Sequence, residues 1–202
     1  MAIRKNRNAE TRKPEILEGY YQVLIENGFE GSSIGKIAQH LNLHSTLILH
    51  YFKNKDNLQR ELIEFLITKY KAEHMLEFDL IEDSARRFDA MMDLIFSFKW
   101  NRTVDPGVHF GFYYKSFRDE GIRKVFKDMF RWLSDYLYNA FILFNKDSII
   151  KVTDERKAAE YVLTLMKGLE FHAHFLNEGR PFENFANTAK TATIAMLKNG
   201  TF

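Results

Sequence analysis

The chain has 202 residues, enough for one large domain or two small ones, and its hydrophobic fraction of 46% is sufficient for a buried core. It contains no cysteine, which excludes disulfides and thiolate metal sites and fits a cytoplasmic location. The net charge of +2 says nothing about nucleic acid, and we expect neither a membrane span nor a signal peptide, because no long apolar run is present.

The first segment carries a local excess of positive charge. Residues 1–13 hold five basic residues and one acidic residue, a difference of 5 − 1 = +4. Such an arm could lie along DNA phosphates, or it could be a solvated, frayed terminus, and the sequence leaves both possibilities open. We predict that Thr11 caps the first helix, that Pro14 lies in its first turn and that Gly28 ends it. The charged residues are Arg4, Lys5, Arg7, Glu10, Arg12 and Lys13.

Residues 32–58 predict two short helices joined by a tight turn, followed by the start of another helix. Ser33 can cap the first short helix, and Asn42 tolerates the left-handed backbone that the turn needs. Lys53 breaks the second short helix, and Asn54 can cap the helix that begins at Lys55. A helix-turn-helix of this kind places one helix in a DNA major groove. Its apolar positions recur at helical spacing: Ile34, Ile37, Ala38, Leu41, Leu47, Ile48, Tyr51 and Phe52.

The remainder of the chain also predicts helices. Sustained alternation with a period of two is absent from the sequence, so we expect no sheet and an all-α fold. The helix that begins at Lys55 should run to about His74, and a shorter helix should start at Asp105-Pro106. Further apolar stripes predict helices around residues 88–96, 125–144, 153–177 and 183–198.

The last two predicted helices have an apolar arc too wide for one neighbour. Part of it can pack on the chain's own body, through Val162, Met166, Leu169, Ala173 and Leu176. The rest favours a homodimer, although an ordinary monomeric bundle is the alternative. The candidate dimer-interface residues are Tyr161, Leu165, Gly168, His172, Phe175, Ala189 and Ala192.

The helix-turn-helix region resembles the TetR-like bacterial transcriptional repressors over roughly residues 11–66. The resemblance implies an N-terminal three-helix DNA-binding head, residues 1–54, and a C-terminal helical bundle, residues 55–202, for effector binding and dimerisation. The family often has Ser-Lys-Gly where this chain has His44-Ser45-Thr46, and Tyr where it has Leu49, so the target sequence is not carried over. The matching residues are Gly28, Phe29, Ser33, Ile34, Ile37, Ala38, Leu43, Leu47, Ile48 and the run 51–58.

The candidate DNA-binding residues divide by the part of the duplex that they would contact. Ser45, Thr46 and Leu49 should face base edges, with Leu49 suited to a thymine methyl group. His50, Tyr51 and Lys55 should contact phosphates. The candidate set is completed by Ser33, Lys36 and His44.

The aromatic fraction of 15% allows two interpretations of the helical body. The rings can form a packed core, or they can leave an apolar cavity for a small hydrophobic or aromatic effector, as the resemblance also implies. A neutral hydrophobe is one possibility, and a carboxylate near Arg102, Lys115 and Arg118 is the other. The candidate ligand-binding residues are Phe96, Phe110, Tyr113, Tyr114, Phe130 and Phe171.

Catalytic and metal-binding patterns are weak. Glu170, His172 and His174 could hold a metal, but His172 and His174 point to different sides of a helix, so structural roles are favoured. We expect no metal, no cofactor and no enzyme activity, so a helical enzyme is the least favoured of three hypotheses.

The leading hypothesis is a dimeric repressor that binds a pseudo-palindromic operator in double-stranded DNA and is released by the effector. The alternative is a DNA-binding regulator without a ligand, controlled by a partner protein or by its abundance.

Overall fold

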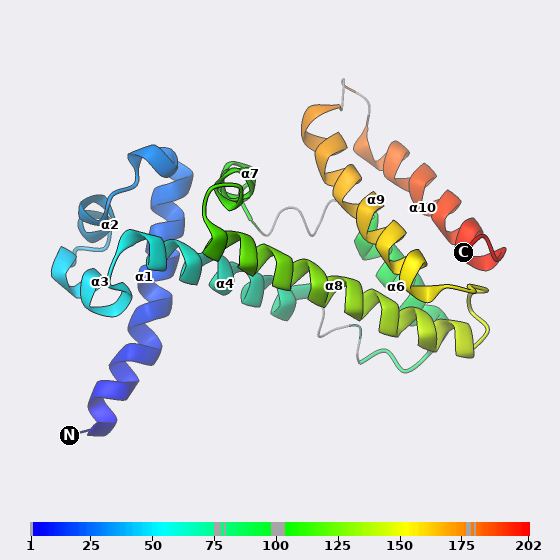
Figure 1. Cartoon of the computed structure of the whole chain (residues 1–202), viewed down its shortest axis with the longest axis horizontal. Coiled ribbons are helices and arrows are strands. Elements are labelled where there is room, and N and C mark those ends of the chain that lie inside the picture. Colours follow the sequence, from blue (N-terminus) through cyan, green and yellow to red (C-terminus); the bar gives the residue numbers. More distant parts are fainter. Residues whose placement is uncertain (1, 75–77, 79, 98–103, 177–178, 180) are drawn as a thin grey trace. The chain divides into compact units, whose positions relative to one another are not determined.

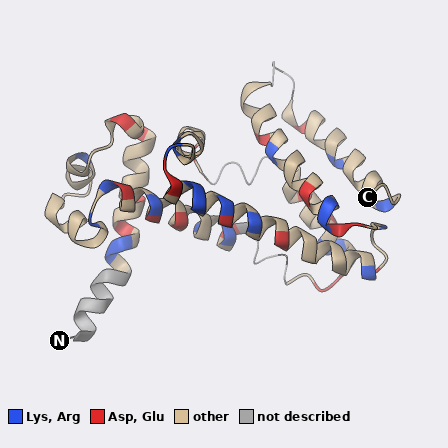
Figure 2. Cartoon of the chain, viewed as in Figure 1, with Lys and Arg blue, Asp and Glu red and all other residues tan. Residues whose placement is uncertain are grey.

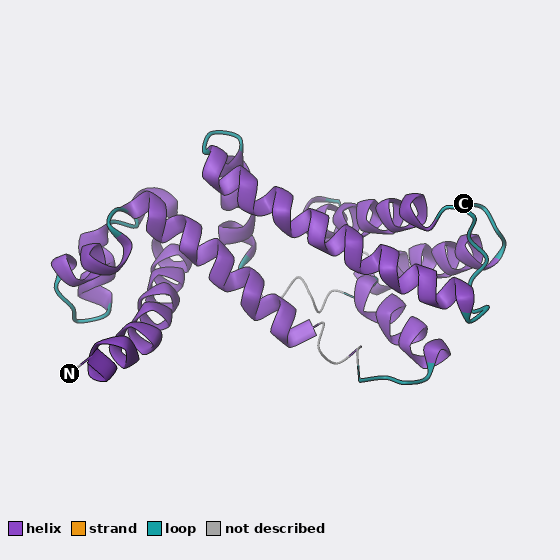
Figure 3. Cartoon of the chain, turned by 60° about the horizontal axis from the view of Figure 1, so that its bottom comes forward, coloured by secondary structure: helices purple, strands orange, loops and turns teal. Residues whose placement is uncertain are grey.

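The computed structural model describes residues 2–74, 78, 80–97, 104–176, 179 and 181–202, with side chains from residue 11 onward except that of His74. Within these residues the regular elements are all helices (Figures 1 and 3). The chain divides into two compact units, one of residues 1–69 and 104–127 and the other of residues 70–103 and 128–202. The first unit is therefore larger than the predicted head of residues 1–54, because the segment 104–127 folds with it.

Helix α1 (Ala2–Gly31) is the central element of the first unit. It starts earlier than predicted, so the expected cap at Thr11 is wrong, and Pro14 lies inside the helix. Proline removes one N–H donor but has a helical φ, so one proline does not set a helix start. The predicted end at Gly28 is instead an interruption, where φ is 66°, and a further turn extends α1 to Gly31. The buried face of α1 comprises Ile16, Leu17, Tyr20, Tyr21, Val23 and Leu24.

Helices α2 (Ile34–His40) and α3 (Ser45–Phe52) form the predicted helix-turn-helix, and both contact α1. The Ser33 hydroxyl accepts the N–H of Lys36 at 3.2 Å, which confirms the predicted cap. Asn42 has φ 52°, the left-handed conformation expected for the turn. At the start of α4 (Lys55–His74), the Asn54 side chain accepts the N–H of Asn57 at 2.9 Å, so this predicted cap is also confirmed.

Helix α7 (Pro106–Ser116) also packs against α1. Its predicted start is confirmed, because Asp105 Oδ1 accepts the N–H of Val108 at 3.0 Å. The Phe29 ring meets Phe112 edge-to-face, with centroids 4.9 Å apart. Phe29 also lies against Gly111, where an added Cβ would be 2.2 Å from a ring carbon. A glycine at this position is therefore what allows the ring of α1 to contact the backbone of α7.

The second unit is a helical bundle with its own core. It contains α6 (Ser84–Ile95), most of α8 (Glu120–Lys146), α9 (Glu155–Phe175) and α10 (Phe182–Lys198). Fully buried rings of Phe88 and Phe144 meet edge-to-face at 5.4 Å in this core. The C-terminus is fastened to the bundle, since the N–H of Thr153 donates to the Phe202 carbonyl at 2.7 Å. Among the described residues, no helix combines the length and the apolar character that crossing a bilayer requires.

The contact between Phe29 and Gly111 gives a prediction about stability. Gly111→Ala should lower the free energy of unfolding by roughly 1–3 kcal/mol, because the new methyl overlaps the ring. The control is Gly35→Ala in α2, where a Cβ would meet only the Ser33 hydroxyl at 3.7 Å, so stability should be unchanged or slightly higher. Urea unfolding monitored by circular dichroism measures both. A Gly111→Ala protein as stable as its parent would contradict the described contact.

Candidate DNA-binding surface and effector cavity

Helix α3 has one buried face and one exposed face. Ile48 and Phe52 are fully buried, whereas Thr46 and Leu49 are exposed and Ser45 is half-buried. Two of the three predicted base-reading residues, Thr46 and Leu49, are thus exposed, whereas Ser45 lies at the edge of the buried face. No residue of this helix is Lys, Arg, Asp or Glu, as Figure 2 shows. Such a face offers hydroxyl, imidazole and apolar contacts without a fixed charge.

The other predicted DNA-binding residues on and near α3 differ in their exposure and in their contacts. His44 is the N-cap of α3 but makes no side-chain cap hydrogen bond, and its side chain is exposed. His50 is exposed and meets the half-buried Tyr51 edge-to-face at 5.4 Å. The Ser33 hydroxyl caps α2, and the Lys36 ammonium donates to the Asn27 side chain at 3.2 Å.

Lys55 has a structural partner that sequence reasoning missed. Its ammonium donates to the Phe29 carbonyl at 3.3 Å. Burial lowers the pKa of Lys55, and the nearby positive charge of Lys115 lowers it further. An ammonium has three donors, so one bond to Phe29 leaves donors for a phosphate. Lys53, at the end of α3, is exposed and was not among the predicted contacts.

The basic N-terminal arm is only partly described. The side chains of Arg4, Lys5 and Arg7 lie outside the described residues. Arg12 pairs with Glu15 at 2.7 Å, and Lys13 pairs with Glu61 at 2.7 Å. The two described cations of the arm therefore already have acidic partners within the first unit.

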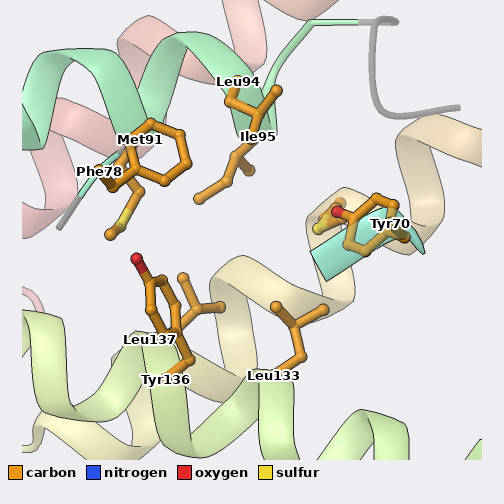
Figure 4. A pocket seen from close by; sticks show the side chains of 9 residues that line it. Tyr70, Phe78, Met91, Leu94, Ile95, Leu133, Tyr136 and Leu137 are labelled. Atoms are coloured by element: carbon orange, nitrogen blue, oxygen red, sulfur yellow. The ribbon is translucent and has the colours of Figure 1, made fainter. Parts of the chain in front are cut away.

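A small apolar cavity lies in the second unit (Figure 4). Its volume is about 20 Å³, and Tyr70 and Tyr136 contribute the hydroxyl groups of an otherwise apolar lining. Burial raises the pKa of the Tyr70 hydroxyl well above its ordinary value, and the Glu170 carboxylate raises it further, so this group stays a neutral phenol. The lining consists of Tyr70, Phe78, Met91, Leu94, Ile95, Leu133, Tyr136, Leu137 and Met166.

The six predicted ligand-binding residues do not line this cavity. Phe96 is buried in the core of the second unit, Phe130 lies 5.4 Å from the Lys167 ammonium, and Phe171 is exposed beside Phe175. The other three belong to the first unit: Phe110, Tyr113, which stacks on Phe126 at 4.8 Å, and Tyr114, which is exposed. The predicted set is therefore divided between the two units, and its role in ligand binding stays a prediction.

Several residues that line the cavity lie on helix faces that the sequence periodicity predicts to be buried. Met91 and Ile95 share a face of α6, and Leu133 and Leu137 share a face of α8, at spacings of four residues. That signal identifies a core face but does not tell where the core leaves a cavity. Of the basic residues considered for a carboxylate effector, Lys115 and Arg118 belong to the first unit. Arg102 lies outside the described residues.

The predicted dimer face of α9 and α10 is incompletely covered within the chain. Among the described residues, an added Cβ at Gly168 would meet no atom within 4 Å, and Phe175 is 59% exposed. Leu176, expected on the inner side, is also exposed because it is the C-cap residue where α9 ends. Tyr161, Leu165, His172 and Ala189 are half-buried, and Ala192 is exposed.

On α9, His172 and Glu170 each contact a neighbouring side chain. His172 stacks on Phe185, with centroids 4.1 Å apart and planes within 6°. Glu170 is buried and pairs with Lys167 at 2.9 Å. In the described part of the chain, no group of three His, Cys, Asp or Glu residues could hold a metal ion.

Among curated proteins, none matches the sequence. A TetR transcription regulator from Haloarcula marismortui ATCC 43049 has a similar fold, with 15% identity, a TM-score of 0.79 and coverage of 93% of this chain and 98% of that one. A transcriptional regulator from Saccharomonospora viridis in complex with choline has 17% identity, a TM-score of 0.76 and coverage of 92% and 96%. AibR in complex with isovaleryl coenzyme A and operator DNA has 16% identity, a TM-score of 0.60 and coverage of 94% and 99%.

At these identities the solved structures establish the fold alone. The family itself is established by two sequence matches. Residues 16–62 match the model described as bacterial regulatory proteins, tetR family, and residues 83–199 match the one described as tetracyclin repressor-like, C-terminal domain. The chain therefore belongs to the tetR family of bacterial regulatory proteins, which are DNA-binding transcriptional regulators and not enzymes.

Proposed function

We propose that the protein is a dimeric, ligand-responsive repressor that binds a pseudo-palindromic operator. The observation that carries the proposal is the exposed face of α3, with Thr46 and Leu49 outside and Ile48 and Phe52 buried behind them. Two such helices in successive major grooves, roughly 34–36 Å apart, would read two half-sites. The open face around Gly168 on α9 supports a second copy as the source of the other reading helix.

Base reading would depend on few polar groups. Ser45 and Thr46 can donate or accept hydrogen bonds with either type of base pair, and Leu49 can contact a thymine methyl. With no cation on α3, the electrostatic part of the affinity must come from its surroundings, where Lys53 is the C-cap of α3, Lys55 begins α4 and Lys36 belongs to α2.

The effector would bind in the cavity of the second unit and would be a neutral hydrophobic molecule. The lining has no charged side chain, so a carboxylate would be desolvated without a partner. Tyr70 and Tyr136 could orient one polar group of such a ligand. The described volume of about 20 Å³ fits roughly one water, so binding requires the cavity to open.

Helix α4 offers a route from this cavity to the DNA-binding surface. Tyr70 lines the cavity, and Lys55 begins the same helix beside α3. Opening the cavity would displace Tyr70, and the displacement would pass along the continuous helix. To change operator occupancy from mostly bound to mostly free, the ligand must favour the released state by about 5.5 kcal/mol.

The small cavity also supports a second candidate function. A regulator controlled by a partner protein or by its abundance needs no ligand-sized cavity. The cavity of the second unit (Figure 4), at about 20 Å³, is too small to hold a ligand without opening. This alternative keeps the same DNA-binding surface. The two functions differ in whether a small apolar molecule stabilises the protein.

Thr46 gives the test of the reading surface. Thr46→Ala should change the preferred base at one position per half-site, by roughly 1–3 kcal/mol, because the exposed hydroxyl is lost without disturbing the core. Selection from a random DNA pool measures the preference. Thr68→Ala, an exposed threonine on α4, is the control and should return the parent consensus. An unchanged consensus for Thr46→Ala would remove this residue from the reading set.

A matched pair of ligands tests the cavity. 1-Hexanol should raise the midpoint of thermal unfolding in a concentration-dependent manner, because it would bind only the folded state. Hexanoate should raise it far less, since burying its carboxylate is costly. Leu94→Phe, which adds bulk to the lining, should reduce the effect of hexanol.

Ile142→Phe, at an exposed position of α8, is the control for that variant and should respond to hexanol like the parent. Equal stabilisation by hexanoate would contradict the neutral effector. Absence of stabilisation by both compounds would favour the regulator without a ligand.

A further inference from the structure

The first unit contains an open groove much larger than the cavity described above. It lies between the C-terminal end of α1 and helix α7, and its volume is about 400 Å³. Small-molecule sites in proteins typically have volumes of roughly 300–1,000 Å³. The groove can therefore accept a ligand without the opening that the cavity of about 20 Å³ requires.

Glycines keep the groove open, and a fixed ring forms part of its wall. Of the described atoms, an added Cβ at Gly28 would meet only the Glu30 carboxylate, at 3.7 Å, and one at Gly107 would meet only the Asp105 carboxylate, at 3.1 Å. The missing side chains thus leave space beside both acids. The Phe29 ring is fixed by its contacts with Gly111 and α7, so the wall exists before a ligand arrives.

The apolar part of the groove is provided by α1. Leu24, Ile25 and Phe29 line it, and Ile25 is 43% exposed. An exposed branched residue beside an aromatic ring is a suitable surface for a hydrocarbon body. The Tyr114 side chain, 60% exposed, borders the groove from α7.

The charged part of the lining is acidic on balance. Glu30 and Asp105 contribute two carboxylates, and Lys115 contributes one ammonium. Within the described residues neither acid forms an ion pair, although the Glu30 carboxylate is near enough to the Lys55 ammonium to raise the pKa of Lys55. Asp105 uses one oxygen to cap α7, which leaves its other oxygen for a ligand.

The aromatic rings of the groove already attract cations from the protein. The Lys115 ammonium lies 5.3 Å from the centre of the Phe29 ring, and the Arg118 guanidinium lies 4.9 Å from the centre of the Tyr114 ring. The negative faces of such rings favour positive charge, so a ligand cation can use this interaction where it displaces one of these side chains or meets the opposite face of a ring.

We propose that this groove is a second ligand site, which binds a small organic cation with an apolar body, such as an alkyl- or arylammonium ion. Its charge meets Glu30 and Asp105, and its body lies on Leu24, Ile25 and Phe29. The site is separate from the cavity of the second unit and does not depend on the effector proposed there. A ligand here contacts Phe29, whose carbonyl accepts the Lys55 ammonium, so the site adjoins the start of α4.

Three aromatic probes of similar size test the proposal on the full chain: 2-phenylethylammonium, 2-phenylethanol and 3-phenylpropionate. Methyl-labelled protein should show saturable shifts of the Leu24 and Ile25 signals with the cation. Glu30→Gln together with Asp105→Asn should weaken this binding about tenfold or more, as expected for lost charge-assisted hydrogen bonds. Asparagine caps helices about as well as aspartate, so α7 should persist, and an unchanged unfolding midpoint checks this.

Glu26→Gln is the matched control, because Glu26 is an exposed acid of the same helix outside the groove lining, and it should leave cation binding unchanged. Equal binding of 2-phenylethanol would overturn the assigned charge. Tighter binding of 3-phenylpropionate, lost in Lys115→Gln, would make the groove an anion site instead. Absence of Leu24 and Ile25 shifts with all three probes, or shifts only at Leu133 and Leu137 of the other cavity, would overturn the site.

Discussion

The burial of Ile48 and Phe52 is the interaction on which the DNA-binding surface depends. Burying such side chains contributes roughly 1.5–3 kcal/mol each, and on a helix of eight residues it also fixes which side faces outward. With these two residues in the core, the helical spacing directs Thr46 and Leu49 outward. The caps at Ser33 and Asn54 set where the neighbouring helices begin, so the turn and the reading helix have defined lengths.

A second contact, between Phe29 and Gly111, makes the first unit more than a three-helix head. It joins α7 to the interrupted end of α1, and the same Phe29 accepts the Lys55 ammonium through its carbonyl. Helix α7, far away in sequence, is thus connected to the beginning of α4. This connection links the open groove beside Gly28 to the start of α4. The functional division at residue 54 stays a prediction.

Local signals in the sequence predicted much of this structure. Caps depend on residues three positions apart, and helical faces on spacings of three and four, so Ser33, Asn54 and Asp105 could be recognised directly. The start of α1 could not be recognised, since a proline such as Pro14 can lie either in the first turn of a helix or inside it. The cavity could not be predicted either, because Phe96 and Met91 are both buried in the same core and only packing between helices decides which of them meets empty space. The partner of Lys55 is 26 residues away, beyond any local pattern.

Two copies of this chain are proposed to read one operator together through α3. Native mass spectrometry of the protein with DNA from upstream of its own coding sequence measures this directly, because the mass of the complex counts the bound chains. We expect two chains, or a multiple of two, on each specific duplex, and dissociation as salt is raised, since phosphate contacts release counterions. A specific complex with a single chain, or no complex at low salt, would contradict it.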